Sequence, residues 1–185
     1  MNTHTSPLLI LVVGRPAAGK TTIANRIASS FNLPLLAKDD FKEILFDQLG
    51  TGNRAWSMRL GQASFALLDH AIEQQLKAGS PFIIEAAYNP KYENAKFKEW
   101  QGRYGFKVIQ VHCTAPTDVL VQRFVDRAKS GLRHEGHVDA ESVDEFRASL
   151  GDERVETFDL DGEILEYTGE ASEELLERIA TGLAG

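Results

Sequence analysis

Eight residues near the start of the chain have the types and spacing that bind a phosphate group. Residues 14–21 read Gly-Arg-Pro-Ala-Ala-Gly-Lys-Thr and match the pattern G-x-x-x-x-G-K-[ST] in full. The two glycines let the backbone turn sharply and approach a phosphate closely, so that N–H groups at the start of a helix point at the anion. We expect Lys20 to reach the β- and γ-phosphates of a nucleotide and the Thr21 hydroxyl to bind Mg²⁺. The residues expected to contact the nucleotide in this segment are Gly14, Arg15, Pro16, Ala17, Ala18, Gly19, Lys20, Thr21 and Thr22.

Two carboxylate positions follow apolar runs further along the chain. Asp39 and Asp40 come directly after one run, at the edge where open parallel sheets bind their ligands. We expect Asp40 to orient an acceptor hydroxyl and take its proton. Alternatively, Asp40 and Glu43 form a capping box and only start a helix. Glu85 ends the run Phe82-Ile83-Ile84, and it either binds the same Mg²⁺ or hydrogen-bonds a neighbouring turn.

Three arginines are typical of a mobile segment that closes over a transferring phosphate. Arg123 and Arg127 share one face of a predicted helix, and Arg133 follows in a loop that carries glycines and histidines. Such arginines stabilise the negative charge that spreads over the phosphoryl group, and they help to exclude water. The pattern therefore predicts a lid over about residues 116–150, with Arg133 also touching the nucleotide. The alternative is a solvated helix face on which arginines pair with acids such as Asp126.

Other polar residues near these motifs have less specific patterns. His134 and His137 lie in the lid loop at a spacing that matches no standard zinc site, so we expect them to shape the loop or touch the acceptor. Arg54 and Arg59 stand near the start of a long predicted helix. They are candidates for binding an anionic acceptor, and the alternative is that both are solvated.

The elements that must position these residues follow from hydrophobic patterning. Continuous apolar runs predict strands buried on both faces, and apolar residues at helical spacing predict helices between them. This alternation favours an α/β chain with a five-stranded, mostly parallel sheet and helices on both of its faces. The strands are expected at residues 8–13, 33–37, 82–84, 106–112 and within 162–167. The helices are expected to begin at residue 20 and then to cover about residues 41–49, 54–77, 91–104, 119–128, 143–150 and 173–183.

Composition narrows the class of protein. The 185 residues fit one domain, residues 1–185, and a chain of this length needs no disulfide or metal to fold. The net charge of −7 argues against long nucleic acid as a partner, because that partner favours a basic surface. The single cysteine, Cys113, fits a reducing compartment, and the apolar run at residues 8–13 is too short to cross a bilayer. We therefore expect a cytoplasmic protein with no membrane partner.

Taken together, these motifs resemble those of the small P-loop kinases described as AAA-type ATP-dependent kinases of unknown substrate. The resemblance spans most of the chain. A similar layout occurs in the kinase domain of polynucleotide 5′-hydroxyl kinases and, more distantly, in zeta-toxin kinases and small antibiotic phosphotransferases. The residues that carry it are 14–22, Lys38-Asp39-Asp40, Glu85, Arg123-x-x-x-Arg127 and 133–139, which read Arg-His-Glu-Gly-His-Val-Asp.

The resemblance implies a three-layer P-loop NTPase fold with a helical lid, and it implies ATP and Mg²⁺. In the polynucleotide kinases the second aspartate of the pair resembles the general base, which maps onto Asp40. The lid arginine that contacts the ATP phosphates maps onto Arg127 first and onto Arg123 second. The chain departs from the group's pattern at Glu135, where a proline often stands, and this departure affects the conformation expected for the loop.

We therefore predict an ATP- and Mg²⁺-dependent kinase that transfers the γ-phosphate to a hydroxyl group of a small-molecule acceptor. Two alternatives stay open. One is a nucleotide-dependent switch or ATPase that controls a protein partner. The single acid at Glu85 and the absence of the guanine-reading pattern N-K-x-D argue against it. The other is a kinase for the 5′-hydroxyl end of a nucleic acid, against which stands the net charge of −7.

Overall fold

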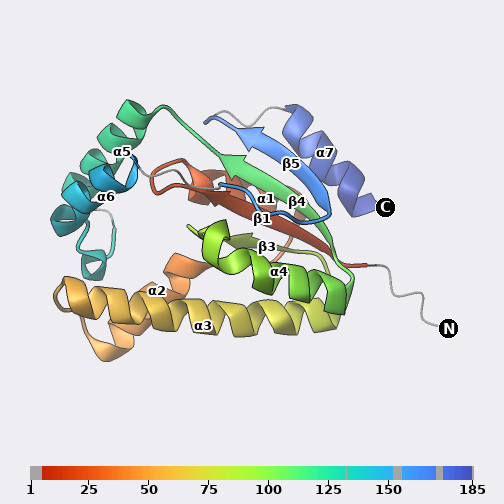
Figure 1. The fold of residues 1–185 in the computed structure, drawn as a ribbon, viewed down its shortest axis with the longest axis horizontal. Helices are drawn as coiled ribbons and strands as arrows, with labels where there is room; N and C mark the ends of the chain where they lie inside the picture. Colours follow the sequence, from red (N-terminus) through yellow and green to blue (C-terminus); the bar gives the residue numbers. More distant parts are fainter. Residues whose placement is uncertain (1–5, 132, 152–155, 170–172, 185) are drawn as a thin grey trace.

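One sheet of five strands forms the middle layer of the protein (Figure 1). The computed structural model describes residues 6–131, 133–151, 156–169 and 173–184. The strands are β1 (Leu8–Gly14), β2 (Leu35–Ala37), β3 (Phe82–Glu85), β4 (Lys107–Cys113) and β5 (Gly162–Tyr167). Their order across the sheet is β2-β3-β1-β4-β5, and every neighbouring pair is parallel. The predicted five-stranded α/β sheet is confirmed, and it is parallel throughout.

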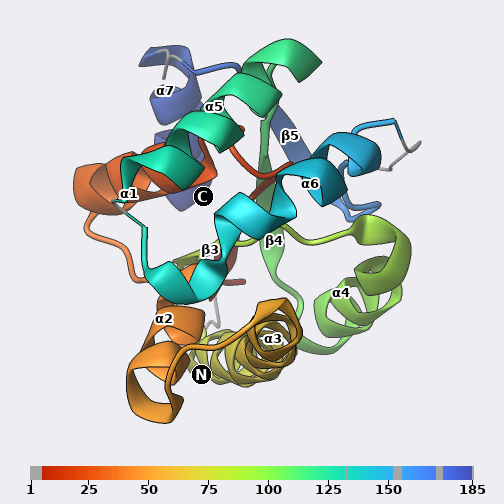
Figure 2. The ribbon, with the colours of Figure 1, turned by 90° about the vertical axis from the view of Figure 1, so that its left-hand side faces the viewer.

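Helices form the two outer layers. α1 and α7 pack on one face of the sheet, and α3 and α4 pack on the other (Figures 1 and 2). Among the described residues, no helix has the length and apolarity needed to cross a membrane. The helices are α1 (Lys20–Phe31), α2 (Lys38–Leu49), α3 (Arg54–Ala78), α4 (Pro90–Tyr104), α5 (Thr117–Ser130), α6 (Val143–Ser149) and α7 (Glu173–Ala184), with the 3₁₀ turns η1 (Glu135–His137) and η2 (Asp139–Ser142) between α5 and α6.

β1 lies in the centre of the sheet because none of its side chains is polar. All seven of its residues are buried, since β3 and β4 flank it and helices cover both faces. Successive side chains of a strand point to opposite faces, so Ile10 packs with α1 and Leu11 packs with α3. Burying each such side chain contributes roughly 1.5–3 kcal/mol. This burial holds β1, and with it the loop that follows Gly14, in a fixed place.

The carboxyl ends of the strands meet at one edge of the sheet. Ala37 at the end of β2 is level with Glu85 at the end of β3. Gly14 at the end of β1 is level with Cys113, which is level with Tyr167 at the end of β5. Ligands bind at this edge of open parallel sheets because the loops there diverge to opposite faces.

The segment from α5 to α6 lies over this edge. Figure 2 shows α5, the 3₁₀ turns and α6 in front of the strand ends, with α2 and α3 beneath them. Loop residues were expected between the two helices, and two short 3₁₀ turns are found instead. We call residues 117–149 the lid, with Leu132 outside the described residues.

Candidate active site

The loop between β1 and α1 has the backbone that a phosphate site needs. Gly14, Ala17 and Gly19 have positive φ angles of 137°, 65° and 92°. A Cβ atom on Gly14 would lie 2.2 Å from the carbonyl oxygen of Cys113, so only glycine fits there. Gly19 is the N-cap of α1, and no side chain caps that end of the helix. The first N–H groups of α1 are therefore available to an anion.

A cleft of about 610 Å³ opens in front of this loop, a size typical of ligand sites. The loop, α2, α3, the end of β3 and the lid all contribute to its walls. Four predicted site residues do not line it: Gly14, Arg15, Ala18 and Asp40. The predicted residues that the structure does bring together on its walls are Pro16, Ala17, Gly19, Lys20, Thr21, Thr22, Glu85, Arg123, Arg127 and Arg133.

The Arg15 side chain points away from the cleft toward the end of the lid. Its Nη1 donates to the carbonyl oxygen of Ser149 at 2.8 Å, and its Nε donates to Glu156 Oε1 at 2.5 Å. Glu156 Oε2 also lies 3.3 Å from His112 Nε2. Arg15 therefore ties the phosphate loop to the end of α6, and only its backbone remains as a contact for a nucleotide.

Lys20, Thr21 and Glu85 form a small polar cluster at the base of the cleft. Lys20 Nζ donates to the carbonyl oxygen of Arg15 at 3.0 Å, and Thr21 Oγ1 donates to Glu85 Oε2 at 3.3 Å. Burial lowers the pKa of the Lys20 ammonium, against the opposing charge of Glu85. Burial likewise raises the pKa of the Glu85 carboxyl, against the opposing charge of Lys20. Burial disfavours the charged form of both groups, so a ligand of opposite charge would stabilise each of them.

The same cluster suits a magnesium ion. A hydroxyl and a carboxylate are hard oxygen donors, which Mg²⁺ prefers, and it usually keeps several waters and phosphate oxygens as further ligands. Within the described ranges, no three His, Cys, Asp or Glu side chains are grouped as a complete metal site. Thr21 and Glu85 therefore fit an ion that arrives together with a nucleotide rather than a metal that the protein holds alone.

The first turn of α2 carries two aspartates, and only Asp39 lines the cleft. The Asp39 carboxylate accepts a hydrogen bond from Lys38 Nζ at 3.2 Å and is ion-paired with Arg133. Burial alone would raise the pKa of Asp39, but the charges of Lys38 and Arg133 hold it well below its ordinary value. Asp40 is exposed, and its pKa is raised by partial burial and by the charge of Asp39. The carboxylate that faces the cleft is therefore Asp39, where the sequence analysis placed Asp40.

The alternative structural role expected for Asp40 is wrong. α2 begins at Lys38 with Ala37 as its N-cap, and no side chain caps this end of the helix. Asp40 and Glu43 therefore form no capping box. Asp40 lies in the first turn, where a negative charge interacts favourably with the helix dipole.

Two lid arginines are held together over the cleft by one carboxylate, Asp139. Arg127 Nε donates to Asp139 Oδ2 at 3.0 Å, and Arg133 Nη1 lies 2.8 Å from both oxygens of Asp139. Arg133 also pairs with Asp39, so it links the lid to α2. Arg123 lines the cleft from α5, one turn before Arg127. Sequence reasoning missed Asp139, and the only available signal was its place at the end of the Arg133 motif.

His134 and His137 fasten the lid loop to α2, which confirms the expectation that they shape this loop. The His134 ring stacks on Phe46 with centroids 5.2 Å apart, and its Nε2 lies 3.2 Å from Asp47 Oδ1. The His137 ring meets the same phenyl ring edge-on, and its Nε2 lies 2.8 Å from Glu43 Oε1. Burial is the main reason that the pKa of His137 falls to about 3, so this ring is neutral near pH 7.

The docking of this loop leaves no room for a side chain at Gly136. A Cβ atom there would lie 2.5 Å from the Phe46 ring. We expect Gly136→Ala to weaken the docking by about 1–3 kcal/mol, which is roughly a 5- to 150-fold faster amide hydrogen exchange in residues 133–142. Gly102→Ala, where a Cβ would meet no atom within 4 Å, is the matched control. Unchanged exchange in Gly136→Ala would contradict the contact with Phe46.

The cleft is strongly cationic although the whole chain is acidic. Seven Lys and Arg side chains line it against three carboxylates, in a chain of net charge −7. Of the two additional arginine candidates, Arg54 lines the cleft, whereas Arg59 does not, and its Cζ lies 5.8 Å from the centre of the Trp56 ring. A cleft with this charge selects anionic ligands and raises their local concentration.

Comparison with known proteins agrees with this geometry. A family model described as an AAA domain matches residues 9–152. Among solved structures, a candidate kinase from Chloroflexus aurantiacus J-10-fl is 30% identical, with 96% of this chain and 98% of that chain covered and a TM-score of 0.83. A gluconokinase from Sinorhizobium meliloti 1021 is 16% identical over 96% and 92% of the two chains, with a TM-score of 0.51. A chain of a Pnkp1/Rnl/Hen1 complex is 23% identical over 66% of this chain and 40% of that chain, with a TM-score of 0.54. The last two show likeness of fold alone, and no curated protein matched the chain.

Proposed function

The chain belongs to the AAA-domain family of P-loop kinases, and from this premise we propose that it transfers the γ-phosphate of ATP to a hydroxyl group of a small-molecule acceptor. One observation carries the proposal. A single cleft combines the phosphate-binding loop, the Asp39 carboxylate and three lid arginines. Phosphoryl transfer depends on positioning and on positive charge, and it needs a group that orients the attacking oxygen.

The nucleotide end of the cleft lies at the phosphate loop. Lys20 and the first N–H groups of α1 would bind the triphosphate, and Thr21 and Glu85 would hold Mg²⁺. When bound, the ion offsets the negative charge of the phosphate oxygens. Because Lys20 is buried and has no hydrogen bond to a described carboxylate, its charge stays available to a phosphate.

Changing Glu85 tests the metal assignment. Glu85→Gln keeps an oxygen that accepts the hydrogen bond from Thr21 Oγ1 but removes the negative charge. We expect the Mg²⁺ concentration for half-maximal activity to rise by about tenfold or more, as for other groups that position a metal. A Mg²⁺ titration of initial rates measures it. A neutral side chain suits this buried position, so the variant should fold, and an unchanged Mg²⁺ requirement would remove Glu85 from the metal site.

Asp39 is the carboxylate that would orient the acceptor hydroxyl. It lines the cleft on α2, and its low pKa keeps it ionised, so it can accept the hydrogen bond of a hydroxyl. A weak base is sufficient, because a loose transition state leaves most of the proton on the attacking oxygen until late in the reaction. Positioning, rather than base strength, is therefore the role that Asp39 supports.

The lid arginines would stabilise the group in transfer. Arg127 and Arg133 are oriented by Asp139, and the guanidinium N–H groups that do not bind Asp139 would meet phosphate oxygens. Arg133 is paired with Asp39 in this structure, and a γ-phosphate would compete for the same guanidinium. Nucleotide binding would thus free Asp39 for the acceptor while it recruits the lid.

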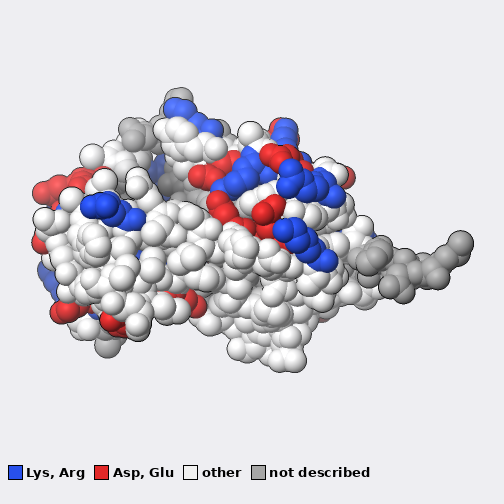
Figure 3. Space-filling model, turned by 90° about the horizontal axis from the view of Figure 1, so that it is seen from below, with Lys and Arg blue, Asp and Glu red and all other residues white. Residues whose placement is uncertain are grey.

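A small acceptor fits better than a long nucleic acid. On the face shown in Figure 3, basic side chains are interspersed with acidic ones beside a broad uncharged area. Basic side chains also pair with acidic ones outside the cleft, as Lys96 does with Asp69 and Arg103 with Glu99. A polynucleotide groove favours a continuous basic surface, whereas here the excess of positive charge lies in the cleft.

The function is tested by following labelled phosphate from ATP. The full chain is incubated with [γ-³²P]ATP, Mg²⁺ and a library of small hydroxyl compounds, and in parallel with a 5′-hydroxyl oligonucleotide. Label on a small molecule is the expected result. Label on the oligonucleotide would support a nucleic-acid kinase, and label in inorganic phosphate alone, unchanged by any acceptor, would support an ATPase or switch and overturn the proposal.

A further inference from the structure

Lys42 is a buried cation that none of the roles above uses. It lies on α2, lines the cleft and is 7% exposed. Its Nζ donates to Ser57 Oγ of α3 at 2.9 Å and lies 5.2 Å from the centre of the Phe46 ring. No described carboxylate lies within 4.0 Å of this ammonium group. A buried charge without a counter-ion costs stability, so its presence at a cleft wall calls for a ligand of opposite charge.

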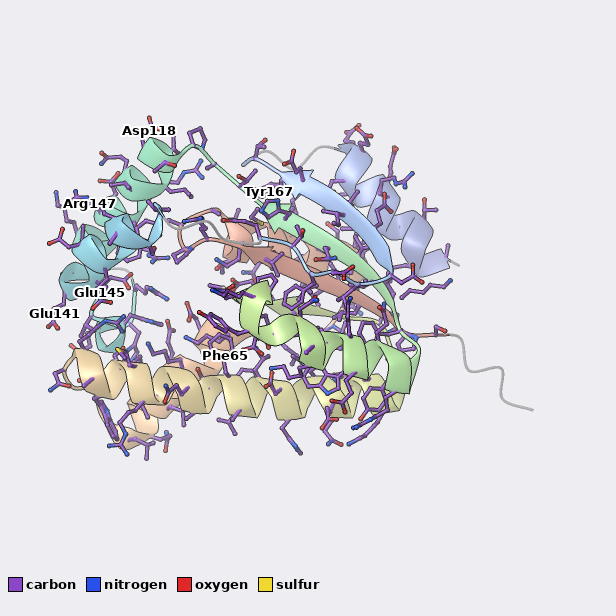
Figure 4. All side chains as sticks on the ribbon, viewed as in Figure 1. Phe65, Asp118, Glu141, Glu145, Arg147 and Tyr167 are labelled. Carbon is purple, nitrogen blue, oxygen red and sulfur yellow. The ribbon has the colours of Figure 1, made fainter. Side chains whose placement is uncertain are left out.

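Further cations gather around Lys42. The Nζ atoms of Lys38 and Lys42 both lie within 4.0 Å of the point that a Cβ of Gly61 would occupy. Arg54 lines the same part of the cleft and is ion-paired with Glu145 of the lid, which Figure 4 labels above the start of α3. Burial first, and then the charge of Lys38, lowers the pKa of Lys42 to about 8. The repulsion between these like charges therefore lowers the stability of the folded protein.

This cluster belongs to α2 and α3, whereas the phosphate loop leads into α1. Lys42 lies three residues after Asp39 on α2, so it is one helical turn further along the same side of this helix. In Figure 4, Phe65 of α3 and Tyr167 at the end of β5 mark the two sides of the cleft, with α2 and α3 on the Phe65 side. Lys42 is thus one helical turn from the carboxylate that would hold the reacting hydroxyl, in the wall of the cleft that α2 and α3 form.

We propose that the acceptor carries an anionic group, a carboxylate or a phosphate, in addition to its reacting hydroxyl, and that Lys42 and Ser57 bind this group with help from Lys38 and Arg54. The inference rests on the proposed kinase function and names the class of its acceptor. The acid group fixes one end of the molecule at Lys42, so that its hydroxyl is presented to Asp39.

Direct binding of an anion is the first test. The phosphate loop is filled with a saturating non-hydrolysable ATP analogue and Mg²⁺, and inorganic phosphate is then titrated by calorimetry. We expect phosphate to bind the wild-type protein about 10- to 100-fold more tightly than Lys42→Met, as for hydrogen bonds to a charged group. Lys77→Met, an exposed lysine of α3, is the matched control and should bind like the wild type. Equal binding by Lys42→Met, or no binding by the wild type, would overturn the inference.

Stability distinguishes a ligand site from a structural lysine. Methionine has a similar length and removes the buried charge, so Lys42→Met should unfold at the same temperature as the wild type or at a higher one. A lower melting temperature with unchanged phosphate binding would assign Lys42 a structural role and contradict the inference.

Matched acceptor pairs test the class of substrate. Glycerol is compared with glycerate, and ribose with ribose 5-phosphate, as acceptors of label from [γ-³²P]ATP. Faster transfer to the acidic member of a pair, with this preference lost in Lys42→Met, supports the inference. If glycerate shows the larger preference, the bound group is a carboxylate, and if ribose 5-phosphate does, the bound group is a phosphate. Equal or better transfer to neutral members overturns it while leaving the kinase function intact. Transfer to no acceptor, with label in inorganic phosphate alone, counts against the kinase function, and the phosphate titration then decides whether the anion site exists.

Discussion

Asp39→Asn should lower kcat for phosphoryl transfer by about 10³-fold, within the range expected for loss of a group that positions the attacking hydroxyl and accepts its proton, while the affinity for ATP stays unchanged or rises because Arg133 loses a competing charge. The amide keeps the size of the side chain but presents a donor where the acceptor hydroxyl needs an acceptor. Arg133 would still be held by two hydrogen bonds to Asp139, so the lid should keep its place. Initial rates with a saturating acceptor, together with nucleotide titrations, measure both quantities.

Asp40→Asn is the matched control for this prediction. It makes the same chemical change on the next residue, which is exposed and outside the cleft lining. We expect its kcat to lie within about threefold of the wild-type value, since surface changes of this kind cost little. If Asp40→Asn loses transfer and Asp39→Asn keeps it, the general base is Asp40 and the orientation of α2 argued above is wrong.

The pH dependence follows from the same ion pairs. The pKa of Asp39 is held below its ordinary value, so its charge stabilises the folded protein above the pKa of the unfolded chain, and this contribution is lost as the pH falls. Asp39 should therefore remain ionised throughout the physiological range. It follows that a fall in kcat between pH 7 and pH 5 would have to arise from another group.

The fold could be predicted from the sequence because its signals are local and agree with one another. The apolar run of β1 predicts a strand that is buried on both faces in the centre of a sheet. The helix α3 ends where Gly79 adopts a φ of +74° and its N–H donates to the carbonyl oxygens of Gln75 and Leu76. Five strands, their direction and most helix bounds follow from such signals. The lid turns do not, since Val138 adopts a φ of +49° that nothing in its residue type predicts.

The site was harder to predict because it depends on helix phase. Successive residues of a helix point about 100° apart, given 3.6 residues per turn, so the first residue of α2 decides whether Asp39 or Asp40 faces the cleft. Patterning locates a helix start only to within a few residues, which is larger than this difference. Lys42 is three residues beyond Asp39 and shares its side of the helix. A lysine in an amphipathic pattern is typical of a solvated face, however, and only the packing of α3 against α2 shows that it is buried.

Lys20→Met should have the largest effect of all, with a fall in kcat/KM of at least about 10³-fold. The ammonium group is buried beside the N-terminus of α1 and makes its one described hydrogen bond to the carbonyl oxygen of Arg15, so most of its donors are available to phosphate oxygens. Methionine fills the same space without a charge. Because burial already lowers the pKa of Lys20, its removal should leave the melting temperature equal or higher.

The contrast with Lys42→Met makes this prediction specific. Both variants remove a buried lysine from one cleft, but Lys20→Met should lose nucleotide affinity and also the slow hydrolysis of ATP in the absence of an acceptor. Lys42→Met should keep both of these and lose only the acidic acceptor. Nucleotide titrations and acceptor-free hydrolysis rates of the two variants measure the difference. If both variants lose nucleotide affinity equally, Lys42 contributes to nucleotide binding, and the cleft holds one phosphate site rather than two.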